Sequence, residues 1–213
     1  VKPDFGGSTN IQLTTAQQRA FDEIIAQFQE KDTVLLHGVT GSGKTEIALR
    51  LGMKIFNADS YQFYREIPVL SNQPETNTDR FHFLADRSIV APINSGDFSR
   101  LAVPYLSEPG VWVGMGLYLS AAIYGLDEER KKGTPFQGAP RLPFRMVVLS
   151  PERKALYESL NARVDFMLER GAMDEARKIL DMIEGRVIER TNPVLKAIGL
   201  SHLLNHLSGH FTF

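Results

Sequence analysis

One eight-residue stretch constrains the fold of this chain more than any other: residues 38–45, GVTGSGKT, satisfy the Walker A pattern G-x-x-x-x-G-K-[ST] in full. An apolar run at 33–37 precedes the motif, and a helical pattern from Lys44 follows it. In this strand-to-helix context the glycines let backbone N–H groups turn toward phosphate oxygens, and the helix start adds the positive end of its dipole. The stretch therefore predicts a site for a di- or triphosphate, without identifying the reaction.

Strands and helices alternate along the chain, which is typical of an α/β fold with a mainly parallel sheet. Thr14, followed three residues later by Gln17, predicts a capping box at the start of the first helix. The pairs Ser150-Pro151 and Asn192-Pro193 predict the starts of two later helices. The expected strands are 33–37, 54–58, 81–84, 111–113 and 144–149. The expected helices are one from 14, then 44–51, 96–106 capped by Ser95, 117–124, a long one from 150, 173–183 and 192–207.

These elements predict an α/β, P-loop three-layer domain with a mainly parallel sheet and a helical C-terminal third. Residues 1–126 would form the P-loop core with its N-terminal helix. Residues 127–143, first charged and then rich in Gly and Pro, would form a loop, and residues 144–213 the last core strand and the C-terminal helices.

Composition narrows the function classes. Lys and Arg number 24 and Asp and Glu 25, so the formal net charge of −1 gives no overall attraction to nucleic acid, and any RNA contact must come from a local patch. The chain has no Cys, which excludes disulfides and thiolate metal sites. No apolar run is long enough to cross a bilayer, and no secretory segment is evident. We expect a soluble, cytoplasmic monomer without membrane contact.

A distinctive set of residues opens the chain: Leu13-Thr14, Gln17-Gln18, Ala20 and the run from Leu35 to Glu46. These residues resemble the start of a PriA-type DNA helicase, and the likeness stops after Glu46. A helicase of that class needs an acidic motif at a strand end and a second motor domain. The acidic run at 127–129 precedes a loop, and the chain is too short for two motor domains.

A second likeness extends over most of the chain, as eight segments in a fixed order. They are the Walker A motif; Ala58-Asp59-Ser60 with Gln62 and Tyr64-Arg65; His82-Phe83-Leu84 with Asp86; Ser95-Gly96-Asp97-Phe98; Val113-Gly114 with Gly116-Leu117-Tyr118-Leu119; Arg153 with Leu156-Tyr157; Arg163-Val164-Asp165 with Met167-Leu168 and Gly171; and Ala197-Ile198-Gly199. In this order the segments resemble the tRNA dimethylallyltransferases (isopentenyltransferases) of the P-loop superfamily.

The resemblance implies a specific reaction. In that family the P-loop holds the diphosphate of dimethylallyl diphosphate rather than ATP, and the prenyl group goes to N6 of an adenine beside the tRNA anticodon. It implies Asp59 as the catalytic base, Lys44 and Arg153 as catalytic cations, Ser60 and Gln62 as adenine contacts, and Thr45 as the ligand of Mg²⁺. The implied diphosphate-binding residues are Gly38, Thr40, Gly41, Ser42, Gly43, Lys44, Thr45 and Arg163.

Residue chemistry agrees with two of these assignments. An adenine amino group is a poor nucleophile, and a carboxylate that accepts its proton restores electron density as the bond forms; a capping or Mg²⁺-associated role for Asp59 stays open. On a helical wheel, Arg153 and Arg163 fall within the apolar stripe of Leu156, Leu160 and Met167. Arginines on such a stripe need an anion, either the ligand diphosphate or a carboxylate such as Asp165 or Glu169.

The chain also departs from the family pattern. Met115 stands in the strand-end motif where the family has a substrate-contacting Thr, and residues 70–74 lack the family's Lys. Residues 127–143 stand in place of a helical insertion that clamps the anticodon stem-loop, and the family's basic C-terminal segment has no counterpart before Phe213.

Several explanations stay open for these departures: a chain that lacks segments, a degenerate relative, or a compact adenylate isopentenyltransferase acting on free AMP, ADP or ATP. A non-prenylating P-loop NTPase is a further alternative. We favour a tRNA anticodon stem-loop as the substrate, because the segments after Asp59 and from Arg153 to Gly171 look more like the tRNA enzymes.

Overall fold

The computed structural model describes residues 11–30, 34–39, 41–74, 78–108, 110–114, 117–124 and 145–209. The chain divides into two compact units, which are described separately below. The sheet unit comprises Val1–Asp59, Asn77–His82 and Ile93–Tyr157. The helical unit comprises Ser60–Thr76, Phe83–Pro92 and Glu158–Phe213.

Helices and strands alternate through the sheet unit, as the sequence predicts. The strands are β1 (Val34–Gly38), β2 (Ile55–Asn57), β3 (Phe81–His82), β4 (Val111–Val113) and β5 (Arg145–Leu149). The α-helices are α1 (Thr15–Gln27), α2 (Lys44–Leu51), α3 (Ser95–Ala102), α4 (Leu117–Tyr124), α6 (Arg153–Glu169), α7 (Ala172–Glu184) and α8 (Leu200–Leu207). Short 3₁₀ helices are η1 (Thr78–Arg80), η2 (Val103–Tyr105) and η3 (Pro193–Lys196).

The five strands form one sheet in the order β3-β2-β4-β1-β5, and every pair in it is parallel. The register between β1 and β5 runs from Val34 opposite Arg145 to Gly38 opposite Leu149. Successive parallel strands need a crossover, and α2 supplies it between β1 and β2. The α/β class with a parallel sheet is therefore confirmed.

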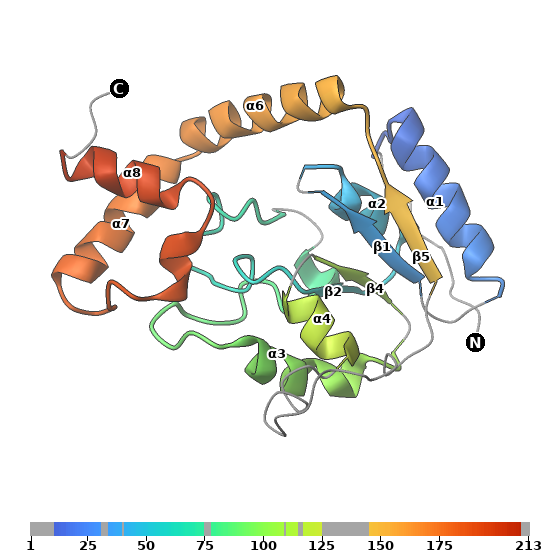
Figure 1. The fold of residues 1–213 in the computed structure, drawn as a ribbon, viewed down its shortest axis with the longest axis horizontal. Coiled ribbons are helices and arrows are strands. Elements are labelled where there is room, and N and C mark those ends of the chain that lie inside the picture. The colour runs from blue at the N-terminus through green and yellow to red at the C-terminus, as the bar shows by residue number, and fades with distance from the viewer. Residues whose placement is uncertain are drawn as a thin grey trace. The chain divides into compact units, whose positions relative to one another are not determined.

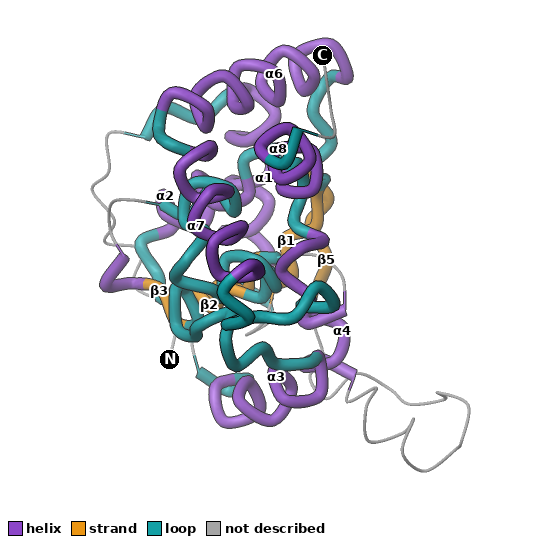
Figure 2. The backbone as a smooth tube through the Cα atoms, turned by 90° about the vertical axis from the view of Figure 1, so that its left-hand side faces the viewer, coloured by secondary structure: helices purple, strands orange, loops and turns teal. Residues whose placement is uncertain are grey.

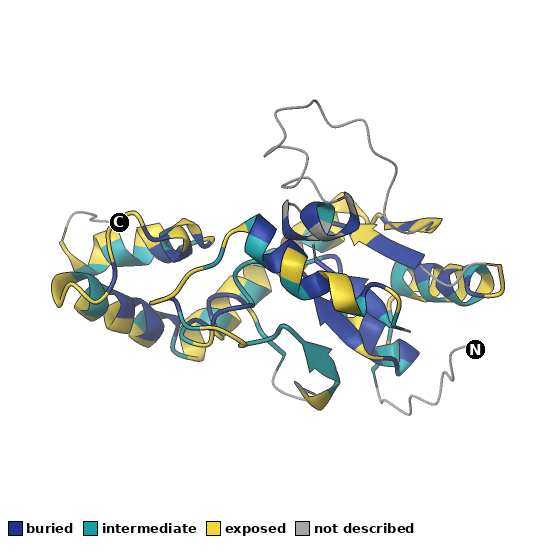
Figure 3. Ribbon diagram, turned by 90° about the horizontal axis from the view of Figure 1, so that it is seen from below, coloured by how far each residue is buried: buried dark blue, intermediate teal, exposed yellow. Residues whose placement is uncertain are grey.

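Side chains alternate across this sheet and supply two apolar layers. On one face Leu36, Ile55 and Val147 pack with residues of α1 and α2, including Ile24 and Ile47. Figures 1 and 2 place α2 and the α3–α4 pair on opposite sides of the sheet. Figure 3 shows the buried strands between partly exposed helices. The three-layer arrangement follows from burying both faces.

An aromatic stack fills part of the second layer. The ring of Phe56 lies 4.9 Å from that of Trp112 and 5.0 Å from that of His82, centroid to centroid. Phe98 of α3 stacks on Tyr118 of α4 at 4.8 Å, and the Ser99 hydroxyl donates to the carbonyl oxygen of Ala121. These contacts join α3 to α4.

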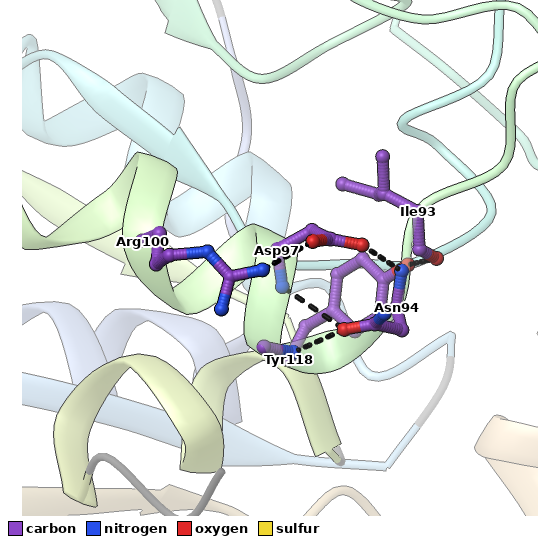
Figure 4. Close-up of polar contacts among 6 residues, drawn as sticks. Ile93, Asn94, Asp97, Arg100 and Tyr118 are labelled. Carbon is purple, nitrogen blue, oxygen red and sulfur yellow. Dashed lines mark hydrogen bonds and ion pairs between the residues drawn. The ribbon is translucent and has the colours of Figure 1, made fainter. Parts of the chain in front are cut away.

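The helix starts follow capping chemistry, with one correction. Thr14 and Gln17 form the predicted capping box of α1. The predicted cap of α3, Ser95, is wrong by one residue: Asn94 Oδ1 accepts from the N–H groups of Gly96 and Asp97, and the Asp97 carboxylate accepts from Asn94 N–H (Figure 4). Both residue types favour the N-cap, so the sequence could not choose between neighbours.

Two further boundaries differ from expectation. The helix predicted from Ser150-Pro151 begins at Arg153, and the carbonyl oxygen of Glu152 accepts its first helical hydrogen bond, from Leu156 N–H. The helix predicted over 192–207 is split into η3 and α8. The break falls at Gly199, whose φ of +84° lies outside the range of a right-handed helix. Glycine adopts such a φ at little steric cost because it has no Cβ.

The helical unit has a core of its own. Ile67, Ile89, Ile179 and Leu200 are fully buried, and Val194 of η3 joins them. The Glu175 carboxylate, also buried, accepts hydrogen bonds from two backbone N–H groups of the 68–70 segment. Among the described residues, no helix combines the length and apolarity needed to cross a bilayer. The predicted 127–143 loop lies outside the described residues.

Candidate active site

The phosphate-binding motif occupies the position where parallel sheets bind ligands. From β1 the chain crosses over β4 to β2 and on to β3, then returns to β4 and finally to β5 on the far side of β1. The strand order thus reverses beside β1, and ligands of open α/β sheets bind at such a switch point, outside the carboxyl ends of the strands. The Walker loop leaves β1 at this point and enters α2.

The glycines of the loop have distinct physical roles. A Cβ on Gly38 would lie 2.7 Å from Ser42 Oγ and 3.1 Å from the carbonyl oxygen of Leu149, so a side chain does not fit between the loop and β5. Gly41 and Gly43 have φ values of +77° and +92°, which disfavour any residue with a Cβ. The loop therefore curls tightly, and Ser42 N–H donates to the carbonyl oxygen of Val39.

Two polar side chains of the loop are suited to an anion. Lys44 Nζ donates to the carbonyl oxygens of Gly38 at 2.7 Å and Val39 at 2.9 Å, which holds its charge against the loop. Ser42 Oγ is buried and makes no hydrogen bond within the described residues. An unsatisfied buried hydroxyl carries an energetic penalty that a bound phosphate oxygen would remove. Thr45, half-buried, follows in the first turn of α2.

Helix α1 contacts this loop through a residue that the sequence indicated only as a capping partner. A Cβ added to Gly43 would collide with the side-chain amide of Gln17. The same side chain accepts a hydrogen bond from Thr14 N–H within the capping box. Gln17 therefore fixes the start of α1 against the Walker loop. Its i+3 spacing from Thr14 predicted the cap, but no local pattern predicts the contact with Gly43.

Asp59 lies at the same sheet edge, two residues beyond β2. Its backbone N–H donates to the side chain of buried Asn57, and its own side chain is half-buried. Gly114 follows β4, and its backbone approaches residues 58 and 59 so closely that a Cβ would lie 2.6 Å from Ala58 C and 2.9 Å from Asp59 N. The close approach of Gly114 thus sets the backbone from which the Asp59 carboxylate projects.

The other candidate site residues divide between the two units. Ser60, Gln62 and Arg163 belong to the helical unit, whereas the Walker loop, Asp59 and Arg153 belong to the sheet unit. Gln62 Nε2 donates to the carbonyl oxygens of Ser71 and Asn72, so both amide hydrogens are used within its own loop. In this structure these two bonds fix the loop that contains residues 71 and 72, and the adenine contact expected of Gln62 stays a prediction.

Of the two arginines predicted to lie on the apolar stripe of α6, one lies there. Leu156, Leu160, Arg163 and Met167 are half-buried at helical spacing, so Arg163 lies on the apolar stripe as predicted. Arg153 does not: it is exposed, with its guanidinium carbon 5.8 Å from the centroid of the Tyr157 ring. A cation over an aromatic face is stabilised without an anion. Thr40, Met115, Gly116 and residues 127–143 lie outside the described residues.

The oxygen-bearing side chains of this site suit an Mg²⁺ ion that substrate phosphates help to bind. Among the described residues, no group of three or more His, Asp or Glu could hold a metal alone. Mg²⁺ in nucleotide enzymes takes one or two protein oxygens, and substrate phosphates supply others. A phosphate oxygen would give the buried Ser42 hydroxyl the hydrogen-bond partner that it lacks among the described residues, and the Thr45 hydroxyl is the nearest candidate Mg²⁺ ligand along the chain.

Two family models match this chain, each over a different part of it. The model described as IPP transferase matches residues 127–213. The model described as the res subunit of type III restriction enzymes matches residues 10–114. The second match includes the opening stretch up to Glu46 and extends to Gly114.

Individual relatives align with both of these parts of the chain. A tRNA dimethylallyltransferase of Chlorobium phaeovibrioides is 27% identical, over 85% of this chain and 82% of the relative. One of Parvibaculum lavamentivorans is also 27% identical, over 84% and 79%. The first alignment runs over 252 positions, more than the 213 residues of this chain, so that relative contains segments without a counterpart here.

Solved structures agree on the fold. The tRNA isopentenylpyrophosphate transferase of Bacillus halodurans superimposes with a TM-score of 0.64 at 22% identity, over 86% of this chain and 80% of that one. A eukaryotic dimethylallyltransferase solved acting on tRNA gives 0.70 at 17% identity, over 84% and 64%. The chain is therefore similar along most of its length to proteins named tRNA dimethylallyltransferase, the likeness that the order of its motifs predicts.

Proposed function

We propose that this protein transfers the dimethylallyl group of dimethylallyl diphosphate to N6 of an adenine beside the anticodon of a tRNA. The observation that carries the proposal is the pairing of two features at one sheet edge. A Walker loop with an orphaned buried hydroxyl, Ser42, follows β1, and a half-buried carboxylate, Asp59, follows β2. The relatives named above as tRNA dimethylallyltransferases support the substrate.

The proposed reaction is a substitution at carbon. N6 of the adenine forms a bond to C1 of the dimethylallyl group, and the bond from C1 to the bridging oxygen of the diphosphate breaks. The electron pair of that bond leaves with the diphosphate. The Asp59 carboxylate takes the proton released from N6, which keeps the amino lone pair available as the bond forms.

Departure of the diphosphate requires positive charge. The backbone N–H groups of the Walker loop, the dipole of α2 and Lys44 would bind its oxygens, and Lys44 already lies at the loop through its bonds to Gly38 and Val39. Mg²⁺, held by Thr45 and the diphosphate, would add Lewis-acid stabilisation. Arg163 is the further diphosphate cation that the family resemblance implies.

Ser60 is a candidate for the adenine edge, because it directly follows Asp59 and carries a hydroxyl that both donates and accepts. Gln62 is the other candidate, although in this structure both of its amide hydrogens are bonded within its own loop. The exposed Arg153 is the weaker of the two arginine candidates, because Tyr157 already stabilises its charge.

A second candidate function has an observation in its favour. The Walker A motif, which lies within the stretch that matches the res subunit model, suits a nucleoside triphosphate as well as a diphosphate. Hydrolysis of ATP without transfer of a prenyl group would identify this function. An adenylate isopentenyltransferase would instead label free AMP, ADP or ATP.

The test is transfer of label from radioactive dimethylallyl diphosphate with Mg²⁺, offered unmodified tRNA in one tube and AMP plus ATP in another. Asp59→Asn should abolish labelling of tRNA while the protein stays folded. Asp181→Asn, at an exposed carboxylate of α7, is the matched control and should label tRNA as the parent does. Label on tRNA in the Asp59→Asn variant would reject the carboxylate base. Label on free nucleotide alone would reject the tRNA substrate.

A further inference from the structure

A cavity lies within the helical unit, away from the Walker loop in sequence. Residues 68–74 form one wall of it, and the C-terminal part of α6 forms the other. Its volume is about 340 Å³, at the small end of sites that bind organic ligands. Pro68, Val69 and Pro74 give it an apolar surface, and Met167 adds a flexible one.

The rim of this cavity combines an aromatic ring with a cation. Phe166 is 50% exposed, although phenylalanine usually buries most of its surface. The guanidinium carbon of Arg170, the first residue after α6, lies 5.0 Å from the centroid of the Phe166 ring. The two side chains thus present a flat surface that bears positive charge.

An amide-bearing loop faces this surface across the cavity. Asn72, with a φ of +53°, is exposed on the opposite wall, and Gln73 lies beside it. Gln73 Nε2 donates to the carbonyl oxygens of Gln62 and Tyr64, so that its side chain braces the loop. Side-chain amides of Asn match the paired donor and acceptor on a nucleobase edge.

The wall is rigidly built, which a preformed site requires. Glu175 of α7 accepts hydrogen bonds from Val69 N–H at 2.8 Å and Leu70 N–H at 2.9 Å. Gln62 holds the next two residues through their carbonyl oxygens. Such fixed walls reduce the ordering cost of binding.

We propose that this cavity binds one unpaired nucleobase of the RNA substrate, stacked on Phe166 and Arg170, with the amide of Asn72 at the base edge. Unpaired bases in RNA loops are recognised by stacking on aromatic rings and guanidinium planes and by hydrogen bonds to their edges. The guanidinium also suits an adjacent phosphate. The inference rests on the proposed function for the identity of the RNA, and the cavity would hold a base other than the one prenylated.

The test measures binding, so that its result is independent of catalysis. A fluorescein-labelled RNA hairpin with a single-stranded loop is titrated with the full chain, and a fully paired duplex and AMP are offered as competitors. Phe166→Ala should weaken hairpin binding roughly tenfold, the loss expected of one stacked base. Phe166→Tyr should keep the affinity, because it keeps the ring. Leu168→Ala, at an equally exposed apolar residue outside the cavity, is the matched control and should bind as the parent does.

Each outcome decides the matter. Equal affinities of Phe166→Ala and Leu168→Ala would overturn the proposal, as would equal weakening of the duplex. Displacement of the hairpin by AMP, lost in Phe166→Ala, would keep the base site and assign it to a mononucleotide. A tenfold loss for the hairpin in a protein that transfers no prenyl group would reject the proposed function and leave the base site standing. Circular dichroism melts confirm that each variant is folded.

Discussion

The backbone of Gly114 approaches that of Asp59 so closely that a Cβ on Gly114 would lie 2.9 Å from the Asp59 nitrogen. The two residues follow neighbouring strands, β4 and β2. The position of the proposed base therefore depends on a glycine in another part of the chain.

Gly114→Ala should lower both stability and activity. The added Cβ meets the Ala58 carbonyl carbon at 2.6 Å, and the φ of +152° disfavours any side chain. Overpacking and backbone strain together should cost about 2–4 kcal/mol in free energy of unfolding, measured by urea denaturation. Gly199→Ala, at a φ of +84° with nothing within 4 Å, carries the backbone cost alone and should lose about 1 kcal/mol. Equal losses in the two variants would contradict the close approach.

Lys44→Ala should weaken binding of inorganic diphosphate by at least about tenfold, because a charge-assisted contact of about 1.5–3 kcal/mol is lost. Isothermal titration calorimetry with diphosphate and Mg²⁺ measures the change. Lys54→Ala removes an exposed lysine whose partner is Glu108, and its affinity should match that of the parent. Unchanged binding in Lys44→Ala would remove the Walker loop from the diphosphate site.

Asn94→Ala should destabilise the sheet unit by about 1 kcal/mol, because Asn94 Oδ1 satisfies two backbone N–H groups at the start of α3. Ser95→Ala should change the free energy of unfolding by a few tenths of a kcal/mol or less, since Ser95 lies inside the helix. Asn94→Asp should retain the cap. Urea denaturation of the three variants distinguishes the observed cap from its neighbour, and a larger loss at Ser95 would reverse the assignment.

Glu175→Gln should change the pH dependence of stability. Burial raises the pKa of the Glu175 carboxyl above its ordinary value of 4.5, against the opposing effect of its bonds to Leu70 and Val69. The folded state then binds the proton more tightly than the unfolded state. This contribution to stability is present below pH 4.5 and is lost as the pH rises through the folded pKa.

Glu175→Gln lacks that titration, so the stability difference between parent and variant should shrink as the pH rises from 4 to 7. The amide also turns a donor toward one backbone N–H, which should cost about 1–2 kcal/mol at any pH. Urea denaturation across that range measures both effects. A difference that grows with pH would show that the pKa is lowered instead.

Local patterns predicted the elements around the site well. The Walker motif and its flanks gave α2 at its observed bounds, and the apolar run at 111–113 gave β4. Predicted bounds were wrong in two kinds of place. One is where two neighbouring residues could each be the N-cap, as Asn94 and Ser95 could. The other is where a glycine interrupts a continuous apolar pattern, as Gly199 does. Those choices depend on backbone dihedrals that side-chain periodicity does not encode.

The candidate site was less predictable than the fold. Gln62 carries the residue type of a base contact, yet its donors are used by the carbonyls of a loop ten residues later. Arg153 satisfied the helical wheel, which counts angles and ignores where a helix meets its neighbours. The contact of Gln17 with Gly43 is likewise set by how α1 packs, which no spacing along the chain contains.

The pairing of Gly38 with Leu149 has a consequence for biosynthesis. β1 emerges early from a ribosome and β5 late, and until β5 docks, β1 presents an unpaired edge beside the Walker loop. Leu149 of β5 packs against the start of the Walker loop, and its carbonyl oxygen would lie 3.1 Å from a Cβ added to Gly38. A nascent chain therefore carries its phosphate motif before the strand that packs against Gly38 has been synthesised.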